Sequence, residues 1–251
     1  MIEKIEIIMP YYNSSSMLAV HLLAMDLFPA EVKRRLILTI VDDCSQKPAL
    51  DVMKVFHGKI GFKIKLFRVL EDIPWNQHGA RNLGADKAHD GWLFMTDIDH
   101  TLPLRSIEYL FRYQEEPDCF YTFARMSAVK DGEGVRYEPM VNGNGRPKPH
   151  PNTYLLTKDL YWKAGGYDED FCGTYGGDGP FRRLLDKAGQ HKHFDNIHII
   201  RWPREVIPDA SQPVEYREKY RALYRELFKD KGGSKSPKPT TWIRFPWERL
   251  L

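Results

Sequence analysis

The first hundred residues alternate between short apolar runs and segments with helical spacing. The apolar runs are rich in β-branched and aromatic side chains, as strands are, and they occupy residues 5–9, 36–41, 62–70 and 92–96. Between these runs, apolar residues recur at the three- and four-residue intervals of a helix, in segments 17–27, 50–56 and 80–88. This alternation predicts right-handed βαβ crossovers and an α/β fold, with a mostly parallel sheet covered by helices on both faces.

The rest of the chain is less regular. Helical patterns occur at 103–114, 158–164, 179–188 and 214–229, and strand patterns at 119–126 and 198–202. Segment 131–152 is rich in glycine and proline and has no apolar periodicity, so we expect a binding loop there. We expect residues 1–230 to form one domain, with halves of about 1–100 and 101–230.

The last twenty residues differ in composition from the rest. Segment 231–239 is rich in Gly, Ser, Lys and Pro, as linkers are, but segment 242–251 contains two tryptophans, a phenylalanine and two leucines. These apolar side chains need a surface to cover. We expect this aromatic tail to dock within the molecule, and the alternative is peripheral contact with a partner or a membrane interface.

Composition describes an ordinary globular protein. The 251 residues are 42% hydrophobic and 28% charged, with 37 Lys and Arg against 34 Asp and Glu, which argues against a disordered or fibrous chain. The resulting charge of +3 is too small to indicate a nucleic-acid partner. The three cysteines form no C-x-x-C pair, which excludes a disulfide framework. Without an apolar membrane span or leader, the expected location is the cytoplasm, or the host cytoplasm for a viral protein.

The most informative motif is an apolar strand that runs directly into two acids, Trp92-Leu-Phe-Met-Thr-Asp-Ile-Asp-His. Side chains two residues apart on a strand point the same way, so Asp97 and Asp99 can converge on one divalent cation at the carboxyl edge of the sheet. An alternative is that the pair only caps the following helix. The strand before it favours a ligand site, because ligands bind at this edge in open α/β sheets.

Two other predicted strands end in polar residues. One is Met9-Pro-Tyr-Tyr-Asn, which brings Pro10 and Tyr12 to the same edge, and the other is Val41-Asp-Asp-Cys-Ser. Asp42 and Asp43 could accept hydrogen bonds from a nucleobase or a ribose hydroxyl. A turn closed by an aspartate and Ser45 is an equally good explanation of the second motif.

Two glycine-containing segments complete the set. Gln77-His-Gly-Ala-Arg-Asn-Leu-Gly opens a helix with Arg81 in its first turn, where it can meet phosphate oxygens or lie on the surface in water. The second runs from Gly165 to Asp178 and is dense in glycine, tyrosine and acids. Asp178 begins a predicted helix, where it can either cap that helix or take a proton from a hydroxyl group.

In order and spacing, these motifs resemble family 2 glycosyltransferases of the GT-A fold, a Rossmann-like arrangement. The family pattern is V-P-x-Y-N, V-D-D-x-S, G-x-x-x-A-R-N-x-G, D-x-D, and then G-G-F-D-E-x-F before W-G-G-E-D. The matching segments begin at Met9, Val41, Gly79, Asp97 and Gly165, and they cover about residues 1–190. Five motifs in the family's order make a chance match a poor explanation.

The resemblance implies a role for each matching residue. Pro10, Tyr12, Asp42, Asp43, Arg81 and Asp97 would bind the donor nucleotide, in the half formed by residues 1–100. Asp97 and Asp99 would hold Mn²⁺ or Mg²⁺ against the diphosphate of a nucleotide sugar, for which UDP is the favoured nucleotide. Asp178 would be the general base that activates a hydroxyl of a carbohydrate or other acceptor, giving transfer with inversion.

The chain departs from the family pattern at the proposed base. Asp178 and Gly179 stand where the family has Glu-Asp, and Asp168, Glu169 and Asp170 are acids close by. Relatives often have a late histidine that completes the metal site; His198 is the candidate here, with His191 and His193 in the same region. For the acceptor and the sugar, the resemblance and the aromatic character of the region suggest Trp162, Tyr175, Gly176 and Gly177.

Two alternatives remain open at this point. The segment Asp97-Ile-Asp-His-Thr-Leu also resembles the first motif of haloacid-dehalogenase phosphatases, in which Asp97 would be the nucleophile and Asp99 the acid/base beside Mg²⁺. That motif normally follows the first strand of its domain, whereas three strand–helix units precede it here. The second alternative is a nucleotide-sugar-binding module that has lost activity through the change at Asp178-Gly179.

Overall fold

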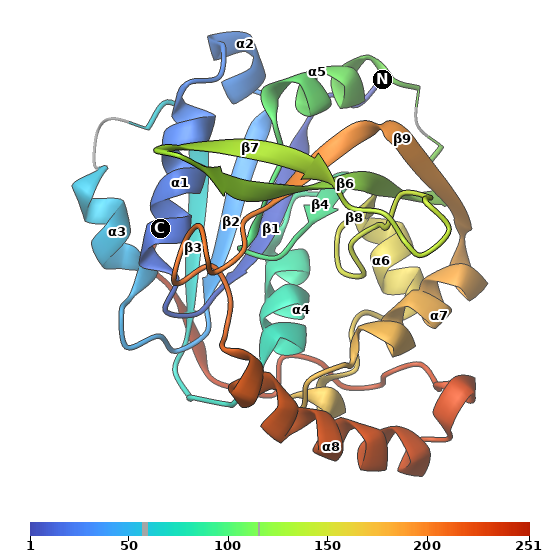
Figure 1. Ribbon diagram of the computed structural model, residues 1–251. Coiled ribbons are helices and arrows are strands. Elements are labelled where there is room, and N and C mark those ends of the chain that lie inside the picture. The colour runs from blue at the N-terminus through green and yellow to red at the C-terminus, as the bar shows by residue number, and fades with distance from the viewer. Residues whose placement is uncertain (57–59, 115) are drawn as a thin grey trace.

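The computed structural model describes residues 1–56, 60–114 and 116–251. Ten strands form one sheet, in the spatial order β10-β3-β2-β1-β4-β8-β6-β9-β5, and β7 pairs with β6 beyond this path. Helices cover both faces of the sheet (Figure 1). The mostly parallel α/β sheet that the sequence predicts is therefore confirmed. Among the described residues, no helix combines the length and the apolar character needed to cross a membrane.

The first half follows the predicted strand–helix alternation. Its strands are β1 (Ile5–Tyr11), β2 (Leu36–Asp42), β3 (Lys63–Val69) and β4 (Trp92–Met95), and its helices are α1 (Ser15–Asp26), α2 (Ala30–Lys33), α3 (Ala49–Val55) and α4 (Gln77–Lys87). β1 lies between β2 and β4 and is parallel to both. The carboxyl ends of β1, β2 and β4 therefore meet at one edge, as the motifs require.

Side chains of β1 alternate between the two faces of the sheet. Ile5 and Ile7 pack with Leu18 and Leu22 of α1 in one core, whereas Ile8 packs with Ala85 of α4 in the other. Both faces of the strand are covered, which explains why its apolar run is nearly continuous. The two cores fix the sheet edge to which β1 delivers Pro10 and Tyr12.

The second half adds strands to the far side of β4. These are β5 (His100–Thr101), β6 (Cys119–Asp131), β7 (Gly134–Pro139), β8 (Tyr154–Thr157) and β9 (Gln190–Arg201), and the helices are α5 (Leu104–Arg112), α6 (Lys158–Ala164), α7 (Asp178–Ala188) and α8 (Val214–Asp230). Short 3₁₀ turns occur at Glu169–Phe171 and Gly233–Lys235. The sequence pattern had indicated neither β5 nor β8, and it placed only the end of β9.

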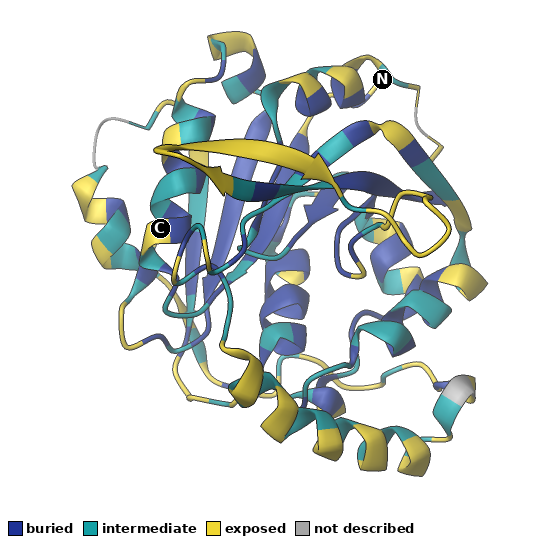
Figure 2. Cartoon of the chain, in the orientation of Figure 1, coloured by how far each residue is buried: buried dark blue, intermediate teal, exposed yellow. Residues whose placement is uncertain are grey.

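The expectation of an irregular loop at 131–152 is wrong for its first part. β7 pairs antiparallel with the end of β6, from Met126 with Pro139 to Asp131 with Gly134. Every residue of β7 is exposed, as the yellow colour of this strand in Figure 2 shows. In β7, Val135 and Tyr137 alternate with Arg136 and Glu138, but this short pattern lies in a segment that was interpreted as a loop from its glycines and prolines.

The aromatic tail docks within the molecule, as the sequence favours. β10 (Trp247–Arg249) pairs antiparallel with β3 at the edge of the sheet. Phe245 is buried against Ala80 and Leu83 of α4, and the Trp242 indole donates a hydrogen bond of 2.8 Å to the Gly165 carbonyl. The tail therefore holds α4 against the sheet from outside.

Candidate active site

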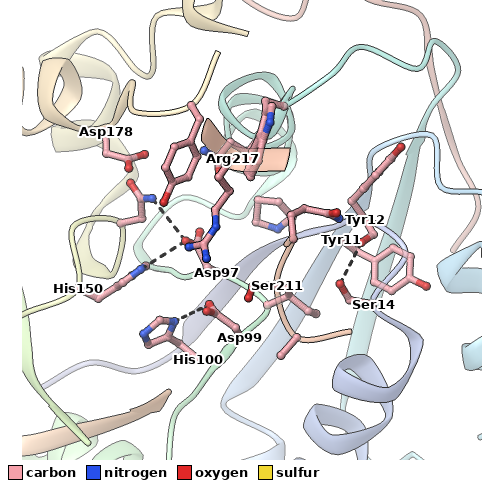
Figure 3. A pocket seen from close by; sticks show the side chains of 18 of the residues that line it. Tyr11, Tyr12, Ser14, Asp97, Asp99, His100, His150, Asp178, Ser211 and Arg217 are labelled. Carbon is pink, nitrogen blue, oxygen red and sulfur yellow. Dashed lines mark hydrogen bonds and ion pairs between the residues drawn. The ribbon is translucent and has the colours of Figure 1, made fainter. Parts of the chain in front are cut away.

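A cavity of about 330 Å³ opens at the carboxyl edge of the sheet. Its volume is within the range of small-molecule sites. Residues from strand ends that lie far apart in sequence line it together, including Pro10, Tyr12, Asp43, Asp97 and Asp99. Figure 3 shows the labelled side chains Asp97, Asp99, His100, His150 and Asp178 gathered in one part of it. The strand-end residues of the motifs therefore meet at one site.

Asp97 is held by side chains from helix α4 and from the segment before β8. Arg81 of α4 is buried, donates a hydrogen bond to Asp97 Oδ1 and does not line the cavity. Asn152 Nδ2 donates to Asp97 Oδ2 at 3.4 Å, and His150 Nε2 lies 3.5 Å from the same oxygen. Arg81 therefore fixes an acidic residue instead of forming the wall itself, which differs from the direct nucleotide contact that the resemblance implies.

Asp99 lies beside two histidine rings that are close to each other. Its Oδ1 lies 2.7 Å from His100 Nδ1, and the rings of His100 and His150 are 3.9 Å apart between centroids. Burial, together with the neighbouring His100, lowers the pKa of His150 well below its ordinary value. A neutral His150 can donate or accept one hydrogen bond without adding charge to the cavity.

The carboxylates fit a divalent cation of the kind that this fold implies. Among the described residues, no group of three or more His, Cys, Asp or Glu side chains forms a complete protein site. Asp97 and Asp99 both line the cavity, and no described residue donates a hydrogen bond to the second carboxylate oxygen of Asp99. Mg²⁺ is commonly bound by one or two carboxylates, with substrate phosphates and water as its other ligands.

The structure separates the two acids at the end of β2. Asp42 is fully buried, and its oxygens accept hydrogen bonds of 2.8 Å from the backbone of Ser45 and Ala49, so it closes the turn into α3. Asp43 lines the cavity and accepts a bond of 2.9 Å from Asn76. Burial raises the pKa of Asp43 to about 7, although the Asn76 bond opposes the shift. Only Asp43 is placed to meet a ligand.

Asp178 is the first residue of α7, and its side chain lines the cavity. Burial raises its pKa, and its Oδ1 has no hydrogen-bond partner among the described residues. His78 of α4 lies behind it, with Nε2 3.9 Å from that oxygen. Burial and the charge of Arg81 lower the pKa of His78 to about 3, so the ring is neutral at physiological pH. A carboxylate with raised pKa and a free oxygen is suited to accept a proton.

The three acids close to Asp178 in sequence have other partners. Asp168 and Asp170 bind Lys231 at 2.5 Å each, and Glu169 accepts hydrogen bonds from Asn82 and from the backbone of the tail. None of the three lines the cavity. Asp178 is therefore the one member of this acidic segment that a ligand in the cavity can reach.

Of the residues suggested for the acceptor and the sugar, one lines the cavity and the others lie outside it. Tyr175 lines the cavity, 4.9 Å from the ring of Trp75. Gly176 and Gly177 precede Asp178 but are not part of the wall; Gly176 has φ of +131°, and a side chain there would meet Tyr224. Trp162 packs on Trp242 of the tail, so it is not available to stack on a sugar.

The late histidines also lie outside the cavity. His198 is in β9, where its backbone bonds Ser106 of α5. His191 and His193 both contact the Thr122 hydroxyl at 2.8 Å on the neighbouring strand. The expectation that His198 completes a metal site is therefore not supported by its placement, because a position inside β9 turns its contacts toward the scaffold.

Several wall residues were not recognised in the sequence. They are Trp75, His100, Arg125, His150, Asn152, Arg201, Ser211 and Arg217. His100 is the last residue of the motif that begins at Trp92, but the sequence offers no reason to assign it a role, and the others come from segments without a motif. His150 and Asn152 lie at the end of the segment that the sequence suggested as a binding loop, but no spacing distinguishes them there.

Comparisons with known proteins agree with this arrangement. TarS from S. aureus, solved in complex with UDP-GlcNAc, has a TM-score of 0.57 and 17% identity, with 93% of this chain and 69% of that chain covered. The mannosyltransferase PcManGT from Pyrobaculum calidifontis, in complex with GDP-Man and Mn²⁺, has a TM-score of 0.61 and 13% identity, covering 93% and 66%. GalNAc-T7 with UDP, GalNAc and Mn²⁺ has 0.56 and 14%, covering 94% and 55%.

At these identities, the solved structures establish a shared fold. No curated protein matches the chain. The sheet flanked by helices is the fold of these GT-A glycosyltransferase neighbours. The family model described as Glycosyl transferase family 2 matches residues 6–175, more than half of the chain. The chain belongs to this family.

Proposed function

We propose that this glycosyltransferase moves a sugar from a nucleoside diphosphate donor, preferably a UDP-sugar, to an acceptor hydroxyl with inversion. The observation that carries the proposal is the convergence of Asp43, Asp97, Asp99 and Asp178 on one cavity. Solved neighbours in complex with UDP, UDP-GlcNAc and GDP-Man support a nucleotide-sugar donor. Residues 1–100 would then bind the nucleotide, and the later part of the chain would bind the acceptor.

The nucleoside binds across the ends of β1 and β2 in this proposal. Pro10, Tyr12 and Trp75 form an apolar and aromatic surface for the base, and Asp43 accepts a hydrogen bond from a base N–H or a ribose hydroxyl. Asp42 has no part in this contact, since its carboxylate is occupied by the turn into α3. The diphosphate then lies toward the end of β4.

Asp97 and Asp99 are the residues that would hold Mn²⁺ or Mg²⁺. A divalent cation supplies stabilisation of the charge that develops on the leaving diphosphate. Arg81 holds Asp97 in place through an ion pair in which the guanidinium is buried. His100 positions Asp99 in the same way through a bond of 2.7 Å.

Asp178 takes the proton of the acceptor hydroxyl. The acceptor oxygen attacks the anomeric carbon as the bond from that carbon to the diphosphate oxygen breaks, and the proton passes to Asp178. One displacement on the face opposite the leaving group inverts the anomeric centre. The raised pKa of Asp178 favours this proton transfer.

Calorimetric titration of UDP, GDP and CDP with and without Mn²⁺ tests the donor site, on wild type and on Asp99→Asn. We expect one nucleotide to bind with micromolar affinity in the presence of metal, and Asp99→Asn to lose that binding. The matched control is Asp118→Asn, which removes an exposed acid outside the cavity. If no nucleotide binds under any metal condition, the donor site is refuted, and the phosphatase alternative would then be assayed with Mg²⁺.

A release assay separates an enzyme from an inactive binding module. Wild type is incubated with candidate nucleotide sugars, and the free nucleoside diphosphate is measured over time. Turnover that Asp178→Asn abolishes supports catalysis through Asp178. Binding without turnover of any donor, in the presence of varied hydroxyl acceptors, would favour the inactive module.

A further inference from the structure

Two arginines line the cavity on the side away from Asp43. Arg125 lies on β6, and Arg201 is the last residue of β9, the parallel neighbour of β6. Arg125 pairs with Ile199, and Arg201 lies two residues further along β9, so the two side chains share a face of the sheet. In the sheet order, β4 and β8 separate β6 and β9 from β1 and β2, which hold the proposed nucleoside site.

Neither guanidinium has a protein counter-ion in the part of the chain that the structure describes. The nearby acids have other partners, since Asp97 binds Arg81 and Asp99 binds His100. Arg125 is only 8% exposed, and its Nε has no hydrogen-bond partner among the described residues. Burial and the charge of Arg201 lower the pKa of Arg125, and the charge of Asp99 only partly offsets this shift, so the two arginine cations repel each other.

A buried cation without a partner destabilises a fold, and two that repel each other destabilise it further. A ligand that brings an anion between them removes this unfavourable energy. Arg217 of α8 extends into the same cavity (Figure 3), and its Nε also has no partner among the described residues. The wall thus offers guanidinium groups from both the sheet and a helix.

We propose that Arg125 and Arg201 bind a phosphate group carried by the acceptor, so that the acceptor is a phosphorylated hydroxyl compound. A phosphate monoester carries a charge of about −1.5 to −2 at neutral pH and three acceptor oxygens, enough for two guanidiniums at once. The placement favours the acceptor over the donor, because both arginines belong to the later part of the chain, and β8 separates their strands from β4 and from the strands that hold the proposed nucleoside site. This inference rests on the proposed function.

Binding of a minimal probe tests the pair directly. Glycerol 3-phosphate, and glycerol as its neutral counterpart, are titrated into the free protein and into protein saturated with UDP and Mn²⁺. We expect wild type to bind glycerol 3-phosphate but not glycerol, with the same affinity in both states. Arg125→Gln and Arg201→Gln should each weaken this binding roughly 10- to 100-fold while leaving the affinity for UDP unchanged. The matched control is Arg105→Gln, an exposed arginine of α5.

Two results would overturn the assignment. If UDP saturation abolishes probe binding and the arginine variants lose affinity for UDP, the pair binds the donor diphosphate. If wild type binds glycerol 3-phosphate no better than glycerol, no phosphate subsite exists there. Failure of UDP to bind would contradict the proposed function instead, and it is measured on the same samples without the probe.

Thermal unfolding shows whether a variant loses probe binding only because it is misfolded. Because Arg125→Gln removes an unpaired buried cation, we expect its Tm to be no lower than that of wild type. Glycerol 3-phosphate should raise the Tm of wild type and of Arg105→Gln but not that of Arg125→Gln. An equal rise in all three proteins would contradict binding at the pair.

Discussion

Buried polar groups have different surroundings at the two ends of strand β1. Glu6 lies near the start of the strand, and Pro10, near its end, lines the cavity. The Glu6 carboxylate is fully enclosed, and four groups donate to it: the Thr39 hydroxyl, Lys65 Nζ at 2.8 Å, and the backbone and ring nitrogens of His89, both at 2.8 Å. We refer to these four residues as the Glu6 cluster. Its hydrogen bonds lower the pKa of Glu6 to about 2 although burial opposes this shift.

Around the cavity, buried polar groups lack such partners. Among the described residues, both ring nitrogens of His78, two guanidinium nitrogens of Arg81, His100 Nε2 and Asp178 Oδ1 make no hydrogen bond. A folded chain normally satisfies its buried polar atoms, as the Glu6 cluster does. The comparison shows that a buried polar group does not by itself indicate a ligand site. A buried polar group that has no hydrogen-bond partner and lies beside a cavity does.

The largest expected effect is on catalysis, and it comes from a change among the polar groups around the cavity. Asp178→Asn should lower kcat roughly 10²- to 10⁴-fold, because the amide cannot accept the acceptor proton. The free energy of unfolding should stay the same or rise, since a buried charge has been removed. Rates of nucleoside diphosphate release and urea unfolding are measured on both proteins. Asp186→Asn, an exposed change on the same helix, should behave as wild type, and an active Asp178→Asn would remove Asp178 from the mechanism.

In the Glu6 cluster, replacing an acid by its amide should affect stability instead of catalysis. Glu6→Gln breaks a buried ion pair with Lys65, so we expect the free energy of unfolding to fall by about 3 to 5 kcal/mol. Nucleotide affinity of the folded protein should not change. Urea unfolding measures the loss, with Glu3→Gln at an exposed position as control. A stability loss below 1 kcal/mol would mean that the Glu6 cluster contributes little.

The pH dependence of the Glu6 contribution has a definite sign. The folded pKa of about 2 lies below the ordinary value of 4.5, so the contribution is complete above pH 4.5 and disappears as pH falls toward 2. The stability difference between wild type and Glu6→Gln should therefore shrink between pH 5 and pH 2. Unfolding free energies at several pH values measure it, and a constant difference would contradict the lowered pKa.

Asp43 should give the smallest effect and one of opposite sign. Its folded pKa of about 7 lies above the ordinary value of 3.8, so the folded state holds a proton that the unfolded state has lost. Stability should decrease as pH rises from 4 to 7, and Asp43→Asn should be the more stable protein at pH 8. Thermal unfolding of both proteins across this range tests the sign, with Asp118→Asn as control. A stability that rises with pH in wild type would refute it.

The sequence predicted the half of the fold in which signals are local. β1 to β4 and helices α1, α3 and α4 follow from apolar periodicity, whereas the short helix α2 was not predicted; the acids at the ends of β2 and β4 mark the edge at which the cavity opens. The pattern could not separate Asp42 from Asp43, because adjacent residues at a strand end look alike in sequence. Only the turn into α3, which occupies Asp42, makes the distinction.

The wall residues that the sequence did not predict were missed for a different reason. Arg125 lies on β6, Arg201 on β9, and His150 in the segment before β8. The pairing of these strands brings together residues that lie far apart in the chain. Nothing in the neighbourhood of Arg125 in the sequence distinguishes it from a surface arginine. Its burial and the absence of an ion-pair partner among the described residues are properties of the folded sheet, so this side of the cavity could be found only in the structure.

Pairing of the tail with β3 also bears on how the chain folds as it is made. β3 ends at Val69, but the strand that covers its edge begins only at Trp247. During synthesis, the hydrogen-bonding edge of β3 therefore stays open until almost all of the described chain has left the ribosome. An open edge is a template for pairing with another chain. A chain that terminates before β10 would therefore contain nearly the whole fold, but the edge of β3 would remain open to pairing with another chain.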